Sequence, residues 1–372
     1  MPHRRTLAPL ARGPHAPSRA ALLAVLAAVG IIGCERSNPV TGPATPSPVA
    51  RPPSGRLLLR ENIITYEGSG QIVHPDVVFT PPGVFAHPWH LVLTPYPVAM
   101  GAEFENPSVF ESDDGTSWGI EPGVVNPLAL PRPQSLGELN SDPALLYVAA
   151  VHELWLYYRS YRSDTDFVWL MRSSDAINWS PPELLFQTLT GGAISPSVVQ
   201  SPDGHFLMWT VNGHCGAGDT RIELRRSADG LQWDPPEPVT LGGFSPWHVF
   251  VRWVSSLNSW VMLTNVKPAK NTCLTKDLWV AFSDDGVHWT HGDHPWLSAG
   301  QDDGGMFSSV VYRSAFAEIG DSLRFWYSGA TTTVVSYTCH RGEMMCQDSV
   351  MRWDPVGSEI RPATDILPRP LN

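Results

Sequence analysis

A short motif, Ser-x-Asp-Gly/Ala-x-x-Trp, occurs four times in the chain and constrains its fold more than any other feature. The copies are SDDGTSW at 112–118, SSDAINW at 173–179, SADGLQW at 227–233 and SDDGVHW at 283–289. Successive tryptophans of the motif are 61, 54 and 56 residues apart. A nearly constant period of this length is typical of a repeat architecture, in which each repeat is one structural unit.

Runs of β-branched and aromatic residues precede each motif. The longer runs are WHLVLTPY at 89–96, LWLYYR at 154–159, FLMWTVN at 206–212, WVMLTN at 260–265 and, without a motif after it, LRFWYS at 323–328. Shorter apolar runs come before them, at 75–79, 143–147, 196–200, 248–253 and 308–313. Such residues, bounded by Gly, Pro, Asn and Asp, predict strands. No stretch after Cys34 has a sustained helical period.

Each unit therefore contains two strands, a loop, a third strand, the motif turn and a fourth strand. Five such units predict an all-β fold: a five-bladed β-propeller of four-stranded antiparallel blades over residues 56–372. The segment RLLLRENIITYEG at 56–68 is expected to supply a strand that closes the last blade, so that no sheet edge stays open. Each motif Asp is expected to accept backbone N–H bonds within its turn, and each motif Trp to pack between blades.

The N-terminus has the anatomy of an export signal. Four arginines accompany AALLAVLAAVGII at 20–32, an apolar run too short for an ordinary membrane span. It ends in Ile31-Ile32-Gly33-Cys34, which resembles the lipobox of bacterial lipoproteins. The resemblance implies a signal peptide over 1–33, removed before Cys34, and a lipid on Cys34; a plain secretory signal is the alternative. Residues 34–55, rich in Pro, Ser and Thr, predict a tether, and the protein is expected in the bacterial cell envelope, facing the periplasm or the exterior.

The net charge and the cysteine content limit the classes of partner and the kinds of cross-link that we expect. Removing the four leader arginines from the 25 basic residues leaves 21 against 36 acidic residues, a net charge of −15. This argues against nucleic acid as a partner, and it leaves the lipid anchor as the only expected membrane contact. Four further cysteines predict two disulfides in an oxidising compartment, and we expect Cys215–Cys273 and Cys339–Cys346. No Cys or His spacing is typical of zinc, so no metal ligand is predicted.

A family resemblance suggests a chemistry. Five blades, the Asp-containing turns and Asp-Pro at the start of an inner strand resemble the five-bladed glycosidase superfamily, which includes glycoside hydrolase families 43, 32, 62 and 68. The resemblance extends from residue 56 to the C-terminus and implies three carboxylates on the inner rim: a base, an orienting Asp and an acid. Glycoside hydrolysis needs two of them across the scissile bond, one with a raised pKa. The resemblance predicts no cofactor, although it is compatible with a central calcium ion.

The chain matches this pattern in part. Asp142, in SDPALLY, fits the orienting Asp, and Asp76, in HPDVVF, is the candidate base. Ser195, in AISPSVV, stands where the family has its acid. Glu105, in ENPSVF, is therefore the best substitute acid on topology, and Glu223, on a third strand, is a poorer alternative.

Further residues at the same strand starts and loops are predicted to line a sugar pocket, because an aromatic face stacks on the apolar face of a sugar. These residues are His74, Arg159, Ser195, Trp247 and His248. Most of the candidate residues also have a structural interpretation. Asp76 and Asp142 could cap strand starts, and His74 and His248 could be hydrogen-bonded channel residues. Trp247 could belong to the core, and Arg159 could be a solvated loop charge.

Three functional hypotheses follow. The first is a surface-anchored, glycan-active propeller that hydrolyses a poly- or oligosaccharide. The second is a non-catalytic glycan-binding or scaffold lipoprotein that has lost its acid, which Ser195 favours. The third is a sialidase-like hydrolase, which would need three rim arginines where the chain offers Arg159, Arg162 and Arg252.

Overall fold

The protein is described by a computed structural model that covers residues 59–60, 63–97, 102–130, 138–214, 219–267, 275–300, 310–338 and 345–362. Strands and turns account for nearly all of these residues. Within these ranges, the one helix is a short 3-10 turn, η1 (Ala102–Phe104). No helix of the described part is long and apolar enough to cross a membrane.

The described strands form five sheets. The first contains β2 (Ile72–Phe79), β3 (Trp89–Pro95) and β4 (Ser108–Ser112). The second contains β5 (Leu139–Val148), β6 (Glu153–Arg162), β7 (Thr165–Ser173) and β8 (Glu183–Leu189). The third contains β9 (Ile194–Gln200), β10 (Phe206–Asn212), β11 (Arg221–Ser227) and β12 (Glu237–Pro238).

The last two sheets depart from this simple order. The fourth contains β14 (Pro246–Val254), β15 (Ser259–Val266), β16 (Asp277–Ser283) and β17 (His288–His291), with β13 (Thr240–Leu241) and β18 (Leu297–Ser298) at its margins. The fifth contains β19 (Val310–Ile319), β20 (Ser322–Thr338), β21 (Met345–Pro362) and β1 (Leu59–Arg60). Within the described residues three sheets have the predicted four strands, one has three and one has six.

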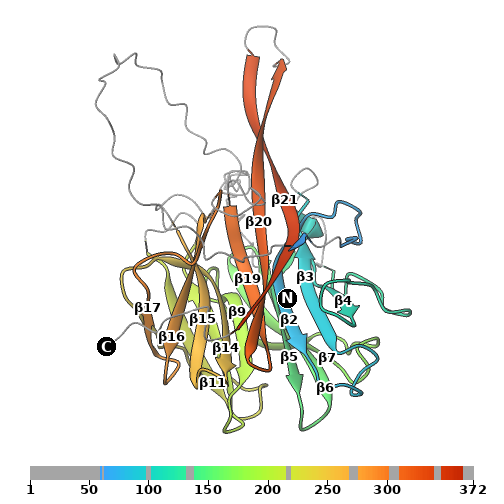
Figure 1. Ribbon diagram of the computed structural model, residues 1–372, viewed down its shortest axis with the longest axis vertical. Coiled ribbons are helices and arrows are strands. Elements are labelled where there is room, and N and C mark those ends of the chain that lie inside the picture. Colours follow the sequence, from blue (N-terminus) through green and yellow to red (C-terminus); the bar gives the residue numbers. More distant parts are fainter. Residues whose placement is uncertain are drawn as a thin grey trace, which may run out of the picture. The chain divides into compact units, whose positions relative to one another are not determined.

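The sheets are arranged as a propeller-like ring (Figure 1). Their innermost strands contact one another in the order β2, β5, β9, β14 and β19, and β19 contacts β2 again. Pairing within the sheets is antiparallel except where β13 runs parallel to β17. The ring brings the first residues of all five innermost strands toward one another.

The fifth sheet is extended by a long hairpin. β20 and β21 pair from Ser322↔Pro362 to Thr338↔Met345, well past the last pairing of β19, at Ala330. Figure 1 shows this hairpin rising beyond the other sheets. Cys346, which the sequence analysis expects to pair with Cys339, lies in β21. β1 pairs with the same strand, at Ser358 and Gly357.

The four motif turns have the predicted hydrogen bonds. In each of them the Asp Oδ1 accepts two backbone N–H groups two and three residues later; for Asp229 both distances, from Leu231 and Gln232, are 2.8 Å. Gly230 has φ 75°, and Ala176 takes the same left-handed backbone in the one copy without glycine. A carboxylate that accepts several N–H bonds stabilises a tight turn.

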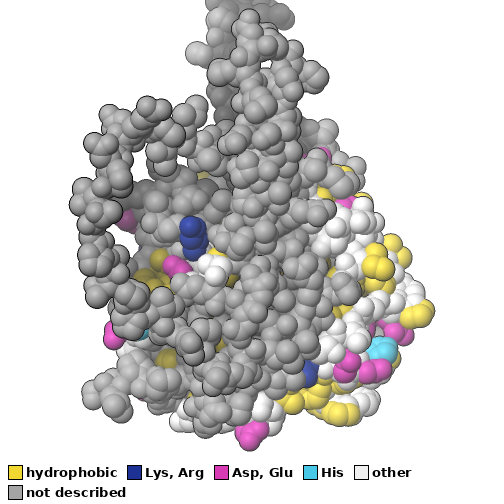
Figure 2. Space-filling view, turned by 45° about the horizontal axis from the view of Figure 1, so that its top comes forward, with side chains coloured by type: hydrophobic (Ala, Val, Ile, Leu, Met, Phe, Trp, Pro, Cys, Tyr) yellow, Lys and Arg dark blue, Asp and Glu magenta, His cyan; other side chains and the backbone are white. Residues whose placement is uncertain are grey.

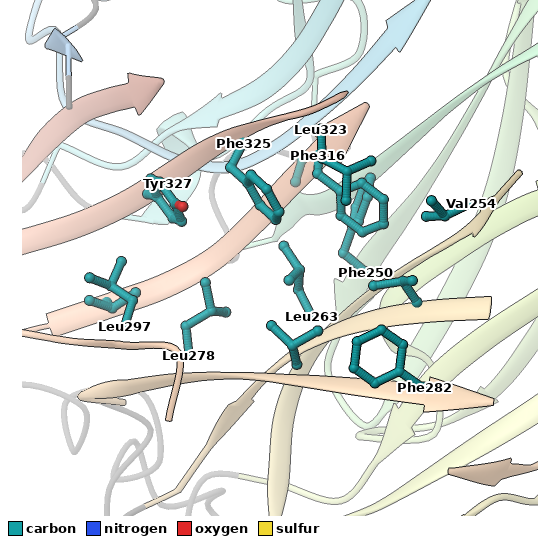
Figure 3. Close-up of a cluster of buried hydrophobic side chains, with 14 residues drawn as sticks. Phe250, Val254, Leu263, Leu278, Phe282, Leu297, Phe316, Leu323, Phe325 and Tyr327 are labelled. Carbon is teal, nitrogen blue, oxygen red and sulfur yellow. The ribbon is translucent and has the colours of Figure 1, made fainter. Parts of the chain in front are cut away.

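Aromatic side chains join neighbouring sheets. The motif Trp289 packs edge-on against Trp209 of the third sheet, with ring centroids 6.2 Å apart, and Trp209 donates to the Gly286 carbonyl at 2.9 Å. Trp233 packs likewise on Tyr157 of the second sheet. A further buried cluster joins the fourth and fifth sheets, with Phe250 and Phe316 near its centre (Figure 3). Burial of such large rings accounts for much of the stability of the ring.

The segment that follows β4 exposes several apolar side chains. Ile120, Val125 and Leu130, which follow β4, are exposed. Figure 2 shows hydrophobic side chains, with acidic and histidine side chains among them, on the side of the ring where β4 lies. Two acidic residues of this segment contact His87, which lies between β2 and β3: Asp113 at 2.7 Å and Glu121 at 3.1 Å.

Candidate metal centre

The pairing register of the innermost strand shifts near its first residues in all five sheets. In β2 the shift falls between Val73 and Asp76, and in β5 between Ser141 and Ala144. Corresponding shifts occur in β9, β14 and β19. Bulges of this kind bend a strand and re-aim its side chains, and they are frequent beside active sites.

The bulge residues of the first three sheets have an unusual backbone. His74, Asp142 and Ser195 have φ of 56°, 52° and 53°, in the left-handed region that residues with a side chain seldom adopt. Each immediately precedes a proline, which restricts its backbone further. Backbone strain of this kind persists only where the surrounding structure imposes it, and it gathers at functional sites.

Three side chains from different sheets meet at this level: His74 of β2, Asp142 of β5 and His248 of β14. Asp142 Oδ1 lies 3.5 Å from His74 Nε2 and 3.5 Å from His248 Nδ1. One ligand atom from each residue lies within 4.8 Å of the other two. All three side chains are buried. The arrangement brings two imidazole nitrogens and one carboxylate oxygen around a single point.

The atoms that face one another here lack hydrogen-bond partners. His74 Nε2, Asp142 Oδ1 and both nitrogens of His248 are buried, and no described residue forms a hydrogen bond with them. Leaving buried polar atoms unpaired costs about 1–3 kcal/mol each. A divalent cation would satisfy them: at bond lengths of about 2.0–2.2 Å its neighbouring ligands lie roughly 3–4 Å apart. Two histidines and a carboxylate are also the donor set of catalytic zinc and of other first-row metals.

Neighbouring charges favour an ionised Asp142 carboxylate, and burial favours a neutral His248 imidazole. Burial alone would raise the pKa of Asp142, but His74, His248 and Arg159 outweigh it and hold this pKa well below its usual range. Burial lowers the pKa of His248 to about 4, and the Asp142 carboxylate only partly opposes this effect. The ionised carboxylate and the neutral imidazole are the forms that bind a metal ion.

Glu105 lies behind His74 rather than across an open pocket. Glu105 Oε1 is 3.2 Å from His74 Nδ1, and Thr94 Oγ1 is 3.1 Å from the same nitrogen. The opposite nitrogen of the ring faces Asp142. A carboxylate on the far nitrogen of a histidine fixes the ring and its tautomer, as is usual for metal-binding histidines.

Asp76 is sealed in the centre of the ring. Its side chain is 0% exposed, and its Oδ1 accepts from Arg252 Nη2 at 2.6 Å. Arg252 also donates to the carbonyls of Leu145 and Val198, so it joins four sheets. The fully buried Arg313 lies 3.8 Å from Asp76 and 3.9 Å from Asp142. Burial raises the pKa of Asp76, and the two arginines oppose that rise.

The remaining predicted pocket residues are less available to a ligand. The hydroxyl of Ser195 donates to the Val249 carbonyl at 3.3 Å and accepts from the Val249 N–H at 3.2 Å, so it joins two sheets. Trp247 is buried and donates to the Tyr312 hydroxyl at 3.0 Å. Arg159 pairs with Asp166 at 2.8 Å and approaches Asp142 at 3.7 Å.

The structure thus brings His74, Asp142, His248 and Glu105 together and places Asp76 beneath them. Sequence reasoning missed Arg313 and Tyr312, although both occupy the bulge of β19 that corresponds to His74-Pro75 in β2. It did not predict that His74, Asp142 and His248 bring three possible ligand atoms together, because these residues come from three sheets and have no local spacing. Cys34, Cys215, Cys273 and Cys339 lie outside the described residues, as does the side chain of Cys346.

Comparison with family models gave no match. The A type blood N-acetyl-alpha-D-galactosamine deacetylase of Flavonifractor plautii is 28% identical over 320 residues, covering 69% of this chain and 40% of that protein. The chain therefore spans well under half of the length of this curated relative.

Solved structures show the same fold. An N-acetylgalactosamine deacetylase from F. plautii, in complex with blood group B trisaccharide, superposes with a TM-score of 0.73 at 23% identity over 84% of this chain and 96% of that one. A family 43 glycoside hydrolase from Bacillus licheniformis has a TM-score of 0.53 at 13% identity, covering 84% and 60%. A thermostable family 43 glycoside hydrolase has a TM-score of 0.51 at 15% identity, covering 77% and 89%. The chain therefore shares its fold with these proteins.

Proposed function

We propose that this chain is a metal-dependent carbohydrate deacetylase, which hydrolyses the acetamide of an N-acetylated sugar to a free amine and acetate. The observation that carries the proposal is the convergence of His74 Nε2, Asp142 Oδ1 and His248 Nδ1, three buried ligand atoms without hydrogen-bond partners among the described residues. The deacetylase similarity in sequence and in structure supports the choice of reaction.

In this proposal His74, Asp142 and His248 hold the cation. When bound, such a cation supplies Lewis-acid polarisation to an acyl carbonyl. Glu105 orients His74 through its Nδ1–H, so that the Nε2 lone pair faces the cluster. Arg159 and Arg313 lie near Asp142 and keep its carboxylate ionised.

The leaving nitrogen of an amide must gain a proton as its bond to the acyl carbon breaks. When Nδ1 of His248 holds the cation, the proton of the neutral ring is on Nε2, which has no hydrogen-bond partner in the described structure. His248 Nε2 is therefore the group that we assign to hydrogen bonding with the acetamide. Water supplies the hydroxyl of the acetate and the second proton of the amine.

Glycoside hydrolysis has weaker support from the same site. It needs two carboxyl groups that flank a bond, roughly 5–9.5 Å apart and open to the substrate. Asp76 is fully buried against Arg252, Glu105 serves His74, and the Ser195 hydroxyl is engaged with Val249. We therefore assign Asp76 to the structure of the channel. The cluster of His74, Asp142 and His248 also favours an enzyme over a non-catalytic glycan-binding protein.

The finer architecture belongs to the same proposal. We assign the five sheets to five blades, with β1 closing the last one through its pairing with β21. The signal peptide over 1–33, lipidation of Cys34, the tether over 34–55, the two disulfides and the envelope location remain predictions of the sequence. A surface glycan is the partner that fits an anchored enzyme of this kind.

The proposal is tested by acetate release. The purified chain, supplied with Zn²⁺ or Mn²⁺, is incubated with oligosaccharides that end in N-acetylgalactosamine or N-acetylglucosamine, and also with arabinan and xylan. We expect acetate and a free amine from an N-acetylated substrate, lost on chelation and in His248→Ala. Release of reducing sugar from arabinan or xylan, with no acetate from any substrate, would overturn it in favour of glycoside hydrolysis.

A further inference from the structure

A hollow lies between the third and fourth sheets, away from the candidate metal centre. Its volume is about 580 Å³. It is lined by the turn between β9 and β10 and by the motif turns that follow β11 and β16. These turns are at the far ends of the strands: Ser201 follows Ser195 by six residues along β9, or about 20 Å at the rise of a strand. A molecule bound here would not touch His74, Asp142 or His248.

Apolar side chains line part of this hollow. Trp253 and Trp260 lie directly opposite each other on β14 and β15, and their rings meet edge-on with centroids 5.3 Å apart. Leu207 lies beside them in the lining. Trp253 is only partly buried, so part of its indole surface is accessible. An accessible indole packs against the apolar face of a ring and attracts a cation placed over it.

The polar lining is acidic, and two of its carboxylates have no partner. Asp203 and Asp285 accept hydrogen bonds within their own turns. The Arg226 guanidinium is paired with Glu237, at 2.8 Å. By contrast, no hydrogen bond or ion pair in the described part of the chain involves the side chain of Asp234 or of Asp284, and both are exposed. The hollow thus combines an indole surface with two uncompensated negative charges.

We infer that this hollow binds an amino sugar with a free, protonated amine. The indole would accept the apolar face of the pyranose, while Asp234 and Asp284 would pair with the ammonium group. An N-acetylated sugar lacks that charge and would bind less well. The choice of an amino sugar rests on the proposed function, since deacetylation produces such a unit. The site would hold the enzyme on a partly deacetylated glycan while the metal centre acts on the remaining acetamides.

The experiment is a calorimetric titration of the full chain with a glucosamine tetrasaccharide, the N-acetylglucosamine tetrasaccharide and a linear diamine. The variants are Trp253→Ala and the double variant Asp234→Asn/Asp284→Asn, with His248→Ala as the control that alters only the metal centre. We expect the glucosamine tetrasaccharide to bind at least about tenfold more tightly than the other two ligands. Both hollow variants should lose that difference, and His248→Ala should keep it.

Three outcomes would overturn the inference: equal binding of the diamine, equal binding of the acetylated tetrasaccharide, or binding that survives both hollow variants. Acetate release is measured on the same samples with a monosaccharide substrate. Selective binding without acetate release would leave this site standing while the proposed function fails. Acetate release without selective binding would support the proposed function and overturn the assignment of this hollow.

Discussion

The two ends of the strands use the same residue, aspartate, in opposite ways. At the motif turns Asp229 is exposed, and its Oδ1 accepts from Ser227, Leu231 and Gln232. At the other end Asp142 is buried in a strained backbone, and its Oδ1 has no hydrogen-bond partner in the described structure. A satisfied carboxylate stabilises a turn, whereas an unsatisfied one in a buried cluster is available to a ligand. The repeated motif therefore belongs to the scaffold, and the candidate metal centre lies where the repeats differ in sequence.

The largest expected effect comes from exchanging one aspartate at each end. Asp142→Asn should reduce deacetylation to background, because an amide is a poor substitute for an ionised ligand. Asp229→Asn should leave activity within about twofold, since an amide oxygen still accepts the turn hydrogen bonds. Rates are measured by acetate release, with circular dichroism to show that both variants fold. An equal loss of deacetylation rate in the two variants would contradict the different roles that we assign to the two ends of the strands.

The central ion pair should affect stability more than any turn. Arg252→Met leaves the buried Asp76 without its 2.6 Å partner, and we expect the free energy of unfolding to fall by about 3–5 kcal/mol. Urea titration measures the change. The double variant Asp76→Asn/Arg252→Met removes the unpaired charge and should recover part of the loss. A neutral effect of Arg252→Met would argue against a structural role for Asp76.

Glu105 offers an intermediate case, since it acts through His74. Glu105→Gln keeps the shape of the side chain but weakens the hold on His74 Nδ1. We expect metal affinity or activity to fall about 10–100-fold. If Glu105 were instead the acid of a glycosidase, the variant would bind metal as the wild type does and would lose only turnover, which metal titration beside the rate assay would reveal.

The smallest expected effect is the pH-dependent contribution of one turn carboxylate, Asp175, to stability. Burial opposes ionisation of Asp175, but hydrogen bonds from Asn178 and Ile177 together outweigh it and lower the pKa of Asp175 to about 2. Its folded pKa is below the unfolded value, so its stabilisation is complete above about pH 4 and is lost as pH falls toward 2. Asp175→Ala should cost roughly 0.5–1 kcal/mol at neutral pH, because the group is exposed and screened. Thermal unfolding of both proteins should converge near pH 2; a constant difference would contradict this account.

Much of the scaffold could be predicted because it repeats. The motif spacing and aromatic runs predicted the strands, and β10 matches the predicted FLMWTVN in full. The extension of β20 and β21 was not predicted, since its polar run around Thr331 lacks the aromatic pattern of the other strands. For the site, the sequence predicted the location but not the roles of the residues. His74, Asp142 and His248 were named at the strand starts, but their roles depend on which atoms are left unpaired, and local sequence does not show this.

The central claim is tested most directly by titrating the metal-free chain with Zn²⁺, followed by calorimetry. The account predicts one tight site in the wild type, lost in both His74→Ala and His248→Ala and kept in Asp229→Asn. Absence of binding in the wild type, or the same affinity in His248→Ala, would contradict the assignment of these three side chains to a metal centre.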